Sequence, residues 1–237
     1  LLLTAHASRV FRTKISEMRR SSTLNYMAQV TAIRKYQHDN IFPYMDIAML
    51  WEDLGGAVKI PKDDIPSVAS PIIKSPDDLS LFKLPENRRR GVIEESLRCL
   101  ELLSRDFRED LAVFAGSWGP FTLAGLARGI SDFLKELIVN PEFAERVLKI
   151  SYKVSVSLAK LLIDHGAQVI LVSDPLASQI SPRHFESYAF PYLQGVVREV
   201  KKRGMPTVLH ICGDVTLILE KMAKTDADCV WIDQKVD

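Results

Sequence analysis

Short apolar runs that alternate with amphipathic helical segments constrain the fold of this 237-residue chain more than any other feature. Strands separated by helices pair in parallel, because each helix carries the chain back to the start of the next strand. The alternation therefore predicts an α/β protein built on a parallel sheet. The expected strands are residues 41–47, 111–115, 168–172, 208–211 and 229–232.

Polar side chains gather at the carboxyl ends of these strands. Active sites form at this edge in barrels and in open α/β sheets alike. Five strands are too few for an eight-stranded barrel, so the chain is either an open sheet or part of a barrel. The polar residues at this edge are Asp46, Ser117, Asp174, His210, Cys212 and Asp233.

One strand ends in the sequence His210-Ile211-Cys212-Gly213-Asp214. Strand side chains alternate between faces, so His210 and Cys212 point the same way. A neutral imidazole and a thiolate are two of the ligands that zinc favours. Two ligands do not make a site, and a buried cysteine beside a hydrogen-bonded histidine produces the same pattern.

Composition and charge argue against several classes of function. A formal net charge of +1 gives no indication of binding to nucleic acid or to a membrane surface. No apolar run reaches the roughly 18 residues that a membrane span needs. The three cysteines, Cys99, Cys212 and Cys229, are few and unevenly spaced, which argues against a disulfide framework and for a reducing cytoplasm.

Several motifs between Tyr26 and Asp237 form a specific set. They are Gly119–Ala124, Ser173–Pro175 with Ala177–Ser178, Ser181–Pro182 with Pro191–Leu193, His210–Asp214, and Ile232–Asp237. This set resembles the uroporphyrinogen decarboxylase superfamily. The His-x-Cys-Gly motif selects the branch of corrinoid-dependent methyltransferases, which includes the methylcobamide:coenzyme M methyltransferases.

The resemblance implies the fold and the extent of the domain. The family fold is a TIM (β/α)8 barrel, of which this chain would carry about strands two to six as an incomplete barrel. Residues 25–237 would form the partial barrel domain. Residues 1–24 match poorly and would form an N-terminal arm.

The resemblance also implies zinc and a corrinoid. In the methyltransferases, zinc is held by the histidine and cysteine that match His210 and Cys212, and by a later cysteine that would lie beyond Asp237. Cys229 lies early in its expected strand, and we interpret it as a core residue. The implied reaction is methyl transfer from a methylated corrinoid, free or bound to a corrinoid protein, to a small thiol such as coenzyme M.

The resemblance also implies roles for further residues near the zinc ion. Asp174 and Asp233 would orient His210 or bind substrate, and Asp46 would act from the opposite wall. Each of these aspartates could instead be a helix cap or a loop hydrogen-bond acceptor, and the Asp174-Pro175 sequence favours a structural turn. The residues expected to line the substrate pocket are Ser117, Trp118 and Ser178.

Two alternatives remain open. The first is metal-free uroporphyrinogen decarboxylation in porphyrin biosynthesis. The decarboxylase branch has an arginine-rich motif that this chain lacks and a tyrosine where Leu126 stands. The second is a non-catalytic fragment that self-associates, because exposed barrel edges pair with other chains.

Overall fold

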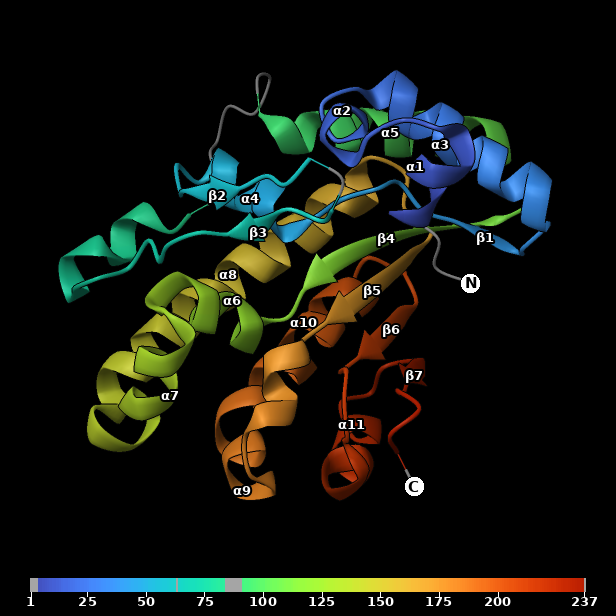
Figure 1. Cartoon of the computed structure of the whole chain (residues 1–237). Helices are drawn as coiled ribbons and strands as arrows, with labels where there is room; N and C mark the ends of the chain where they lie inside the picture. Colours follow the sequence, from blue (N-terminus) through green and yellow to red (C-terminus); the bar gives the residue numbers. More distant parts are fainter. Residues whose placement is uncertain (1–3, 63, 84–90, 237) are drawn as a thin grey trace. The chain divides into compact units, whose positions relative to one another are not determined.

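The computed structural model describes residues 4–62, 64–83 and 91–236 (Figure 1). The chain divides into two compact units. The first comprises residues 1–70, 85–116 and 161–169, and the second comprises residues 71–84, 117–160 and 170–237. Three elements have residues in both units, namely β4 (Ala112–Trp118), β5 (Val169–Ser173) and α8 (Pro141–Asp164).

The first unit is mainly helical. Helix α3 packs against α1 and α5 (Figure 1), and β1 pairs in parallel with the start of β4. The short strands β2 and β3 form an antiparallel pair. The elements are α1 (His6–Phe11), α2 (Ile15–Met18), α3 (Ser22–Tyr36), β1 (Asn40–Ile41), α4 (Ile47–Asp53), β2 (Val58–Lys59), β3 (Ser67–Val68) and α5 (Val92–Phe107).

The first expected strand is much shorter than predicted. β1 ends at Ile41 rather than at Ile47, and Pro43 has no N–H group with which to extend a ladder. Asp46 instead begins α4 as its N-cap, because its carboxylate accepts a hydrogen bond from the Met49 N–H at 3.0 Å. The prediction of a strand over residues 42–47 is therefore wrong.

The first 24 residues, which we expected as an arm, are described from residue 4 onward. They form α1 and α2 and begin α3, whose N-cap Ser21 accepts a hydrogen bond from the Leu24 N–H. Met18 and Arg19 are completely buried. This segment therefore contributes side chains to the interior of the first unit.

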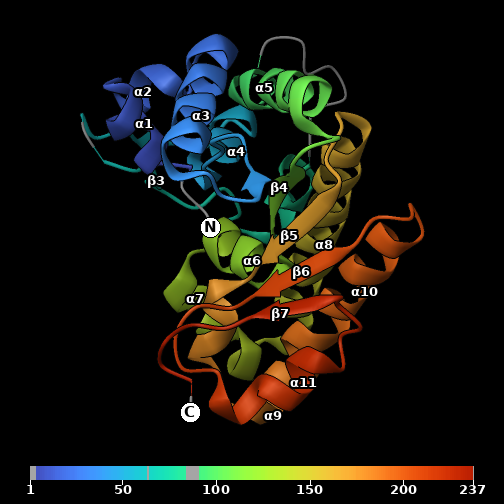
Figure 2. The same cartoon turned by 90° about the vertical axis from the view of Figure 1, so that its right-hand side faces the viewer.

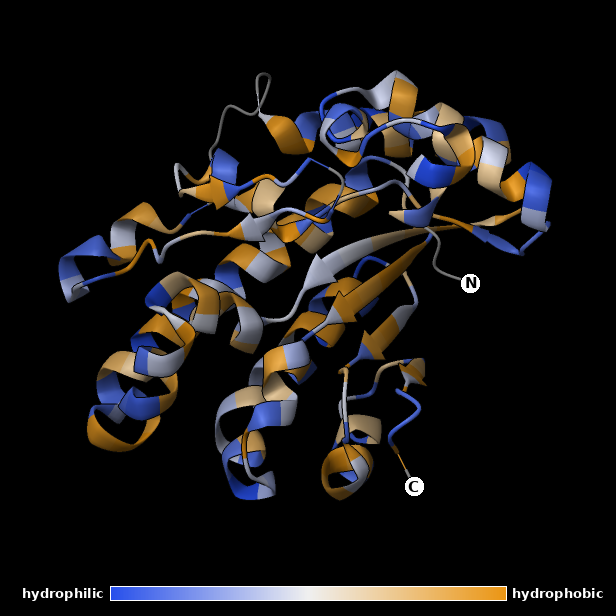
Figure 3. Ribbon diagram, in the orientation of Figure 1, coloured by the Kyte–Doolittle hydropathy of each residue, from blue (hydrophilic) through white to orange (hydrophobic). Residues whose placement is uncertain are grey.

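The second unit contains three parallel strands side by side, β5, β6 (Thr207–His210) and β7 (Cys229–Trp231), as Figure 2 shows. Ser173 lies opposite His210, and His210 lies opposite Trp231. The ribbon of β5 has the colour of hydrophobic residues along most of its length in Figure 3, and its central residues 170–172 are all buried. The prediction of a strand covered on both faces is confirmed for β5.

Hydrogen bonds within each unit place β4 beside β5. The Gln168 N–H donates to the Val113 carbonyl in the first unit, and the Gly119 N–H donates to the Ser173 carbonyl in the second. The strand order is β1-β4-β5-β6-β7. It follows the chain without the reversal of a doubly wound sheet, as in a barrel, and the described strands do not close. The prediction of an incomplete parallel barrel is confirmed.

Helices of the second unit follow the strands. The expected helix after β4 is divided into two at Gly129, whose φ of 93° interrupts it. Within the described part of the chain, no helix is both long and apolar enough to cross a bilayer. The helices are α6 (Pro120–Arg128), α7 (Ile130–Val139), α8, α9 (Pro182–His184), α10 (Phe190–Lys201) and α11 (Leu219–Ala223).

Asp174 joins the end of β5 to the start of α6. Its carboxylate is completely buried and accepts hydrogen bonds from the Thr122 N–H and hydroxyl, both at 2.6 Å, and from the Phe121 N–H at 3.2 Å. Burial raises the pKa of Asp174 to about 6, although these hydrogen bonds oppose the increase. Asp174 thus satisfies backbone donors that the first turn of α6 would otherwise leave free.

This arrangement predicts that Gly119→Ala is destabilising. A methyl group at Gly119 would overlap with the carboxyl group of Asp174, which its three hydrogen bonds hold in place. We expect the free energy of unfolding, measured by urea denaturation, to fall by about 1–3 kcal/mol. Gly116→Ala in the preceding strand, β4, is the control, because its methyl group would meet nothing within 4 Å. Equal stability of the two variants would contradict the prediction.

Candidate metal-binding site

The structure brings His210 and Cys212 together. His210 ends β6, Cys212 follows in the loop, and His210 Nε2 lies 2.9 Å from Cys212 Sγ. The other ring nitrogen, Nδ1, lies 3.0 Å from the carbonyl oxygen of Trp231. A carbonyl oxygen only accepts hydrogen bonds, so Nδ1 is the donor and neutral His210 keeps the lone pair of Nε2 facing the sulfur. This is the tautomer that a metal-binding histidine requires.

Packing against Trp231 also orients the imidazole ring. The ring centroids of His210 and Trp231 are 5.0 Å apart, and the two residues are direct neighbours in the parallel register. The ring therefore has an apolar contact on one side and a backbone hydrogen bond at one nitrogen. Together these contacts limit the rotation of the imidazole.

Cys212 is a protonated thiol at neutral pH. Although Cys212 is exposed at the surface, partial burial of its thiol and the negative charge of Asp233 raise the pKa of that thiol above its ordinary value. The S–H group can therefore donate to the free lone pair of His210 Nε2, which accounts for their short separation. A metal ion binding here would displace that proton.

Asp233 holds the loop that carries Cys212. Its Oδ2 accepts a hydrogen bond from the Gly213 N–H at 2.9 Å, and its Oδ1 accepts one from the Gln234 N–H at 2.8 Å. These two backbone donors lower the pKa of Asp233, which is therefore ionised at neutral pH. The φ of Gly213 is 94°, a conformation that favours glycine. The glycine and the hydrogen bond from its N–H to Asp233 therefore stabilise the same turn.

Ser178 lies next to this loop. Its hydroxyl donates to the Pro175 carbonyl at 2.9 Å, and a Cβ atom on Gly213 would lie 3.4 Å from that hydroxyl. Ser178 also lines a cavity of about 100 Å³ with Asp214, Val215 and Leu217 among its walls. The structure therefore places Ser178 beside the loop that follows Cys212, and its role in substrate binding stays a prediction.

Ser117 and Trp118 contact α8. The Ser117 hydroxyl is buried and donates to the Ser155 carbonyl at 3.4 Å, whereas the Ser155 hydroxyl donates to the Trp118 carbonyl at 2.7 Å. Asp174 adjoins His210 through its backbone N–H, which donates to the His210 carbonyl at 2.9 Å, while its side chain faces α6. The roles proposed for these three residues stay predictions.

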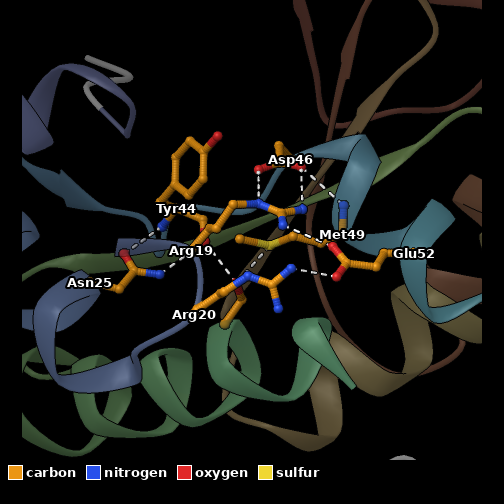
Figure 4. A network of polar contacts seen from close by, with 8 residues as sticks. Arg19, Arg20, Asn25, Tyr44, Asp46, Met49 and Glu52 are labelled. Carbon is orange, nitrogen blue, oxygen red and sulfur yellow. Dashed lines mark hydrogen bonds and ion pairs between the residues drawn. The ribbon is translucent and has the colours of Figure 1, made fainter. Parts of the chain in front are cut away.

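Asp46 belongs to the first unit and forms a buried ion pair. Figure 4 shows the guanidinium of Arg19 between Asp46 and Glu52. Arg19 Nε and Nη2 each lie 3.3 Å from an oxygen of Asp46, and Nη1 lies 2.9 Å from Glu52. No sequence motif indicated Arg19, because an arginine among the other basic residues of this polar segment is typical of a solvated surface.

Zinc would need a further ligand. In residues 4–62, 64–83 and 91–236, no three histidine, cysteine, aspartate or glutamate side chains cluster closely enough to hold a metal ion. Cys229, which we expected in the core, is exposed, because β7 is the edge strand of the described sheet. Cys99 is buried. The site consists here of His210, Cys212 and the β7 contacts that orient them.

A parallel sheet wound in chain order, with a His-x-Cys pair at the carboxyl end of one strand, defines a barrel-type α/β protein with a candidate metal site. The family Uroporphyrinogen decarboxylase (URO-D) matches residues 2–237. The chain therefore belongs to the uroporphyrinogen decarboxylase family.

Relatives of two kinds resemble the chain. A methylcobamide:CoM methyltransferase of Methanosarcina acetivorans is 32% identical over 174 residues, which cover 73% of this chain and 51% of the relative. A uroporphyrinogen decarboxylase of Trichodesmium erythraeum is 36% identical over 157 residues, which cover 61% of this chain and 44% of the relative. The chain thus spans about half the length of these curated relatives.

A solved structure resembles the fold. It is a methyltransferase from Methanosarcina mazei, with a TM-score of 0.85 and 24% identity, over 95% of this chain and 67% of that chain. The likeness covers the described strands and helices almost completely. It supports the barrel-type interpretation of the strand order.

The ion pairs of Glu52 predict acid sensitivity of the first unit. Partial burial acts to raise the pKa of Glu52, but hydrogen bonds from Arg19 and Arg20 outweigh it and lower that pKa. This stabilisation is therefore present above the unfolded-state pKa of about 4.3 and is lost as the pH falls through the lower folded-state pKa.

We expect Glu52→Gln to lower the free energy of unfolding at pH 7 by about 1–2 kcal/mol. The difference from wild type should shrink below about pH 4, where Glu52 becomes neutral. Urea denaturation at a series of pH values measures both effects. Glu109→Gln, which alters an exposed ion pair, is the control and should change stability by less than about 0.5 kcal/mol. A Glu52→Gln difference that is independent of pH would contradict this explanation.

Proposed function

We propose that this chain contributes the metal-binding part of a corrinoid-dependent methyltransferase, which transfers a methyl group from a methylated corrinoid to a thiol such as coenzyme M. One observation carries the proposal: His210 Nε2 faces Cys212 Sγ at 2.9 Å, while the Trp231 carbonyl engages Nδ1. The similarity to methylcobamide:CoM methyltransferases supports the substrate class.

The donor set fits zinc in its chemistry. An imidazole nitrogen with a free lone pair and an adjacent cysteine sulfur are ligands that zinc prefers, and a third ligand would come from outside the described residues. When bound, zinc would favour the thiolate form of a substrate thiol at neutral pH.

The residues of the chain have separate tasks in this proposal. His210 donates from Nδ1 to a backbone carbonyl and offers Nε2, and Cys212 gives up its thiol proton when the metal binds. The cavity lined by Ser178, Val215 and Leu217 lies at the residues that follow Cys212 and Gly213, and it offers a partly apolar space for the thiol substrate. A corrinoid protein or a free methylcobamide would act as co-substrate.

Uroporphyrinogen decarboxylation is the second candidate, because decarboxylases are also among the relatives. Metal-free decarboxylation gives no role to the facing His210 and Cys212 side chains. A cytoplasmic location and self-association of the chain stay predictions.

Metal binding tests the proposal. We expect the wild-type chain to bind one zinc ion in a competition titration with a chromophoric chelator, and His210→Ala and Cys212→Ala each to weaken binding at least tenfold. Cys229→Ala is the matched control, since it removes an exposed thiol from the same sheet. Absence of zinc binding by the folded wild type, or equal binding by all variants, would overturn the proposal and favour the decarboxylase. The corrinoid step is followed separately, by the absorbance of methylcobalamin in the presence of coenzyme M.

A further inference from the structure

Cys212 needs a support that His210 does not. β6 ends at His210, so the histidine lies within the parallel ladder, whereas Cys212 lies in the loop beyond it. The next residue, Gly213, has a φ of 94° and turns the chain away from the strand. The position of Cys212 Sγ therefore depends on what holds this turn.

The carboxylate of Asp233 holds it. Oδ2 accepts the Gly213 N–H at 2.9 Å, and Oδ1 accepts the Gln234 N–H at 2.8 Å. Because each oxygen has its own backbone donor, the plane of the carboxylate is defined at both ends. An ionised acceptor makes these hydrogen bonds stronger than those of a neutral acceptor.

The end of β7 therefore orients both members of the pair. The Trp231 carbonyl engages His210 Nδ1 at 3.0 Å, and two residues later Asp233 holds the peptide that follows Cys212. The parallel register that sets His210 opposite Trp231 brings Asp233 to the turn. The two contacts differ in kind, since one is made by the backbone and the other by a replaceable side chain.

We propose that Asp233 is a positioning residue for the metal site, whose carboxylate holds the Gly213 N–H and thereby keeps Cys212 Sγ beside His210 Nε2. The proposal rests on the proposed function in one respect, namely that the pair binds metal. Asp233 would act through Cys212 and not as a ligand. Asparagine should replace it in this role, because its Oδ1 can still accept the Gly213 N–H beside Cys212, although its NH2 group cannot accept the Gln234 N–H.

The chain offers a matched control at the opposite end of the same strands. Asp228, just before β7, accepts a hydrogen bond from the Thr207 N–H, at the start of β6, at 2.8 Å and one from the Thr207 hydroxyl at 3.1 Å. Asp228→Ala thus removes the same kind of carboxylate tether between the same strands. This variant shows how the loss of such a hydrogen-bonded carboxylate changes stability alone, because Asp228 lies away from Cys212.

The experiment compares the wild type with Asp233→Ala, Asp233→Asn and Asp228→Ala in the same chain. Zinc affinity is measured by chelator competition, and cobalt(II) replaces zinc for spectroscopy, since the thiolate-to-cobalt absorption band reports coordination by Cys212. We expect Asp233→Ala to weaken metal binding about 10- to 100-fold and to reduce the band. Asp233→Asn should stay within about threefold of wild type, as should Asp228→Ala, whatever its thermal stability.

Each other outcome is decisive. If Asp233→Asn lost as much affinity as Asp233→Ala, Asp233 would act as a ligand or through its charge, and the proposal would be wrong. Wild-type affinity in Asp233→Ala would show that the tether has no effect on the site. A wild-type chain that bound no metal would overturn the proposed function itself, so the two failures are distinguishable. Thermal unfolding of each metal-free variant identifies any loss that comes from misfolding.

Discussion

The parallel pairing of β6 with β7 is the constraint on which the site depends. It sets His210 opposite Trp231, so a backbone carbonyl is available to the histidine ring without any specialised side chain. The same register brings Asp233 to the turn after Cys212. A slip of one residue would turn the alternating side chains to the other face and separate both contacts. The geometry of the pair is therefore a property of the sheet as much as of the His-x-Cys motif.

Much of the fold was predictable because its signals are local. A continuous apolar run specified β5, and alternation with helices specified a parallel sheet. The prediction was wrong for the apolar run that begins at Ile41, which we expected to continue as a strand. Pro43 cannot extend the ladder and Asp46 caps α4, so residues 42–46 form the loop that leads into this helix. Gly129 likewise divides one expected helix into two.

The proximity of His210 and Cys212 was predictable from strand periodicity, but their orienting contacts were not. In each hydrogen bond one partner is a main-chain group, the Trp231 carbonyl or the Gly213 N–H, and the amino-acid sequence does not identify such partners. The buried position of Arg19 was not predictable either, since only the tertiary structure shows that its charge is paired with Asp46 in the interior. Such a pair is costly to break, because the remaining carboxylate would be buried without a partner.

The three aspartates chosen from the sequence show why position at a strand end does not identify a catalytic carboxylate. Asp46 accepts the Met49 N–H, Asp174 accepts the Phe121 and Thr122 N–H groups, and Asp233 accepts the Gly213 N–H. In a parallel α/β fold, the carboxyl ends of strands face the beginnings of the following turns and helices, where backbone donors are free. Capping and catalysis therefore select the same residue type at the same edge. What distinguishes Asp233 is the peptide it holds, since that peptide alone carries a candidate metal ligand.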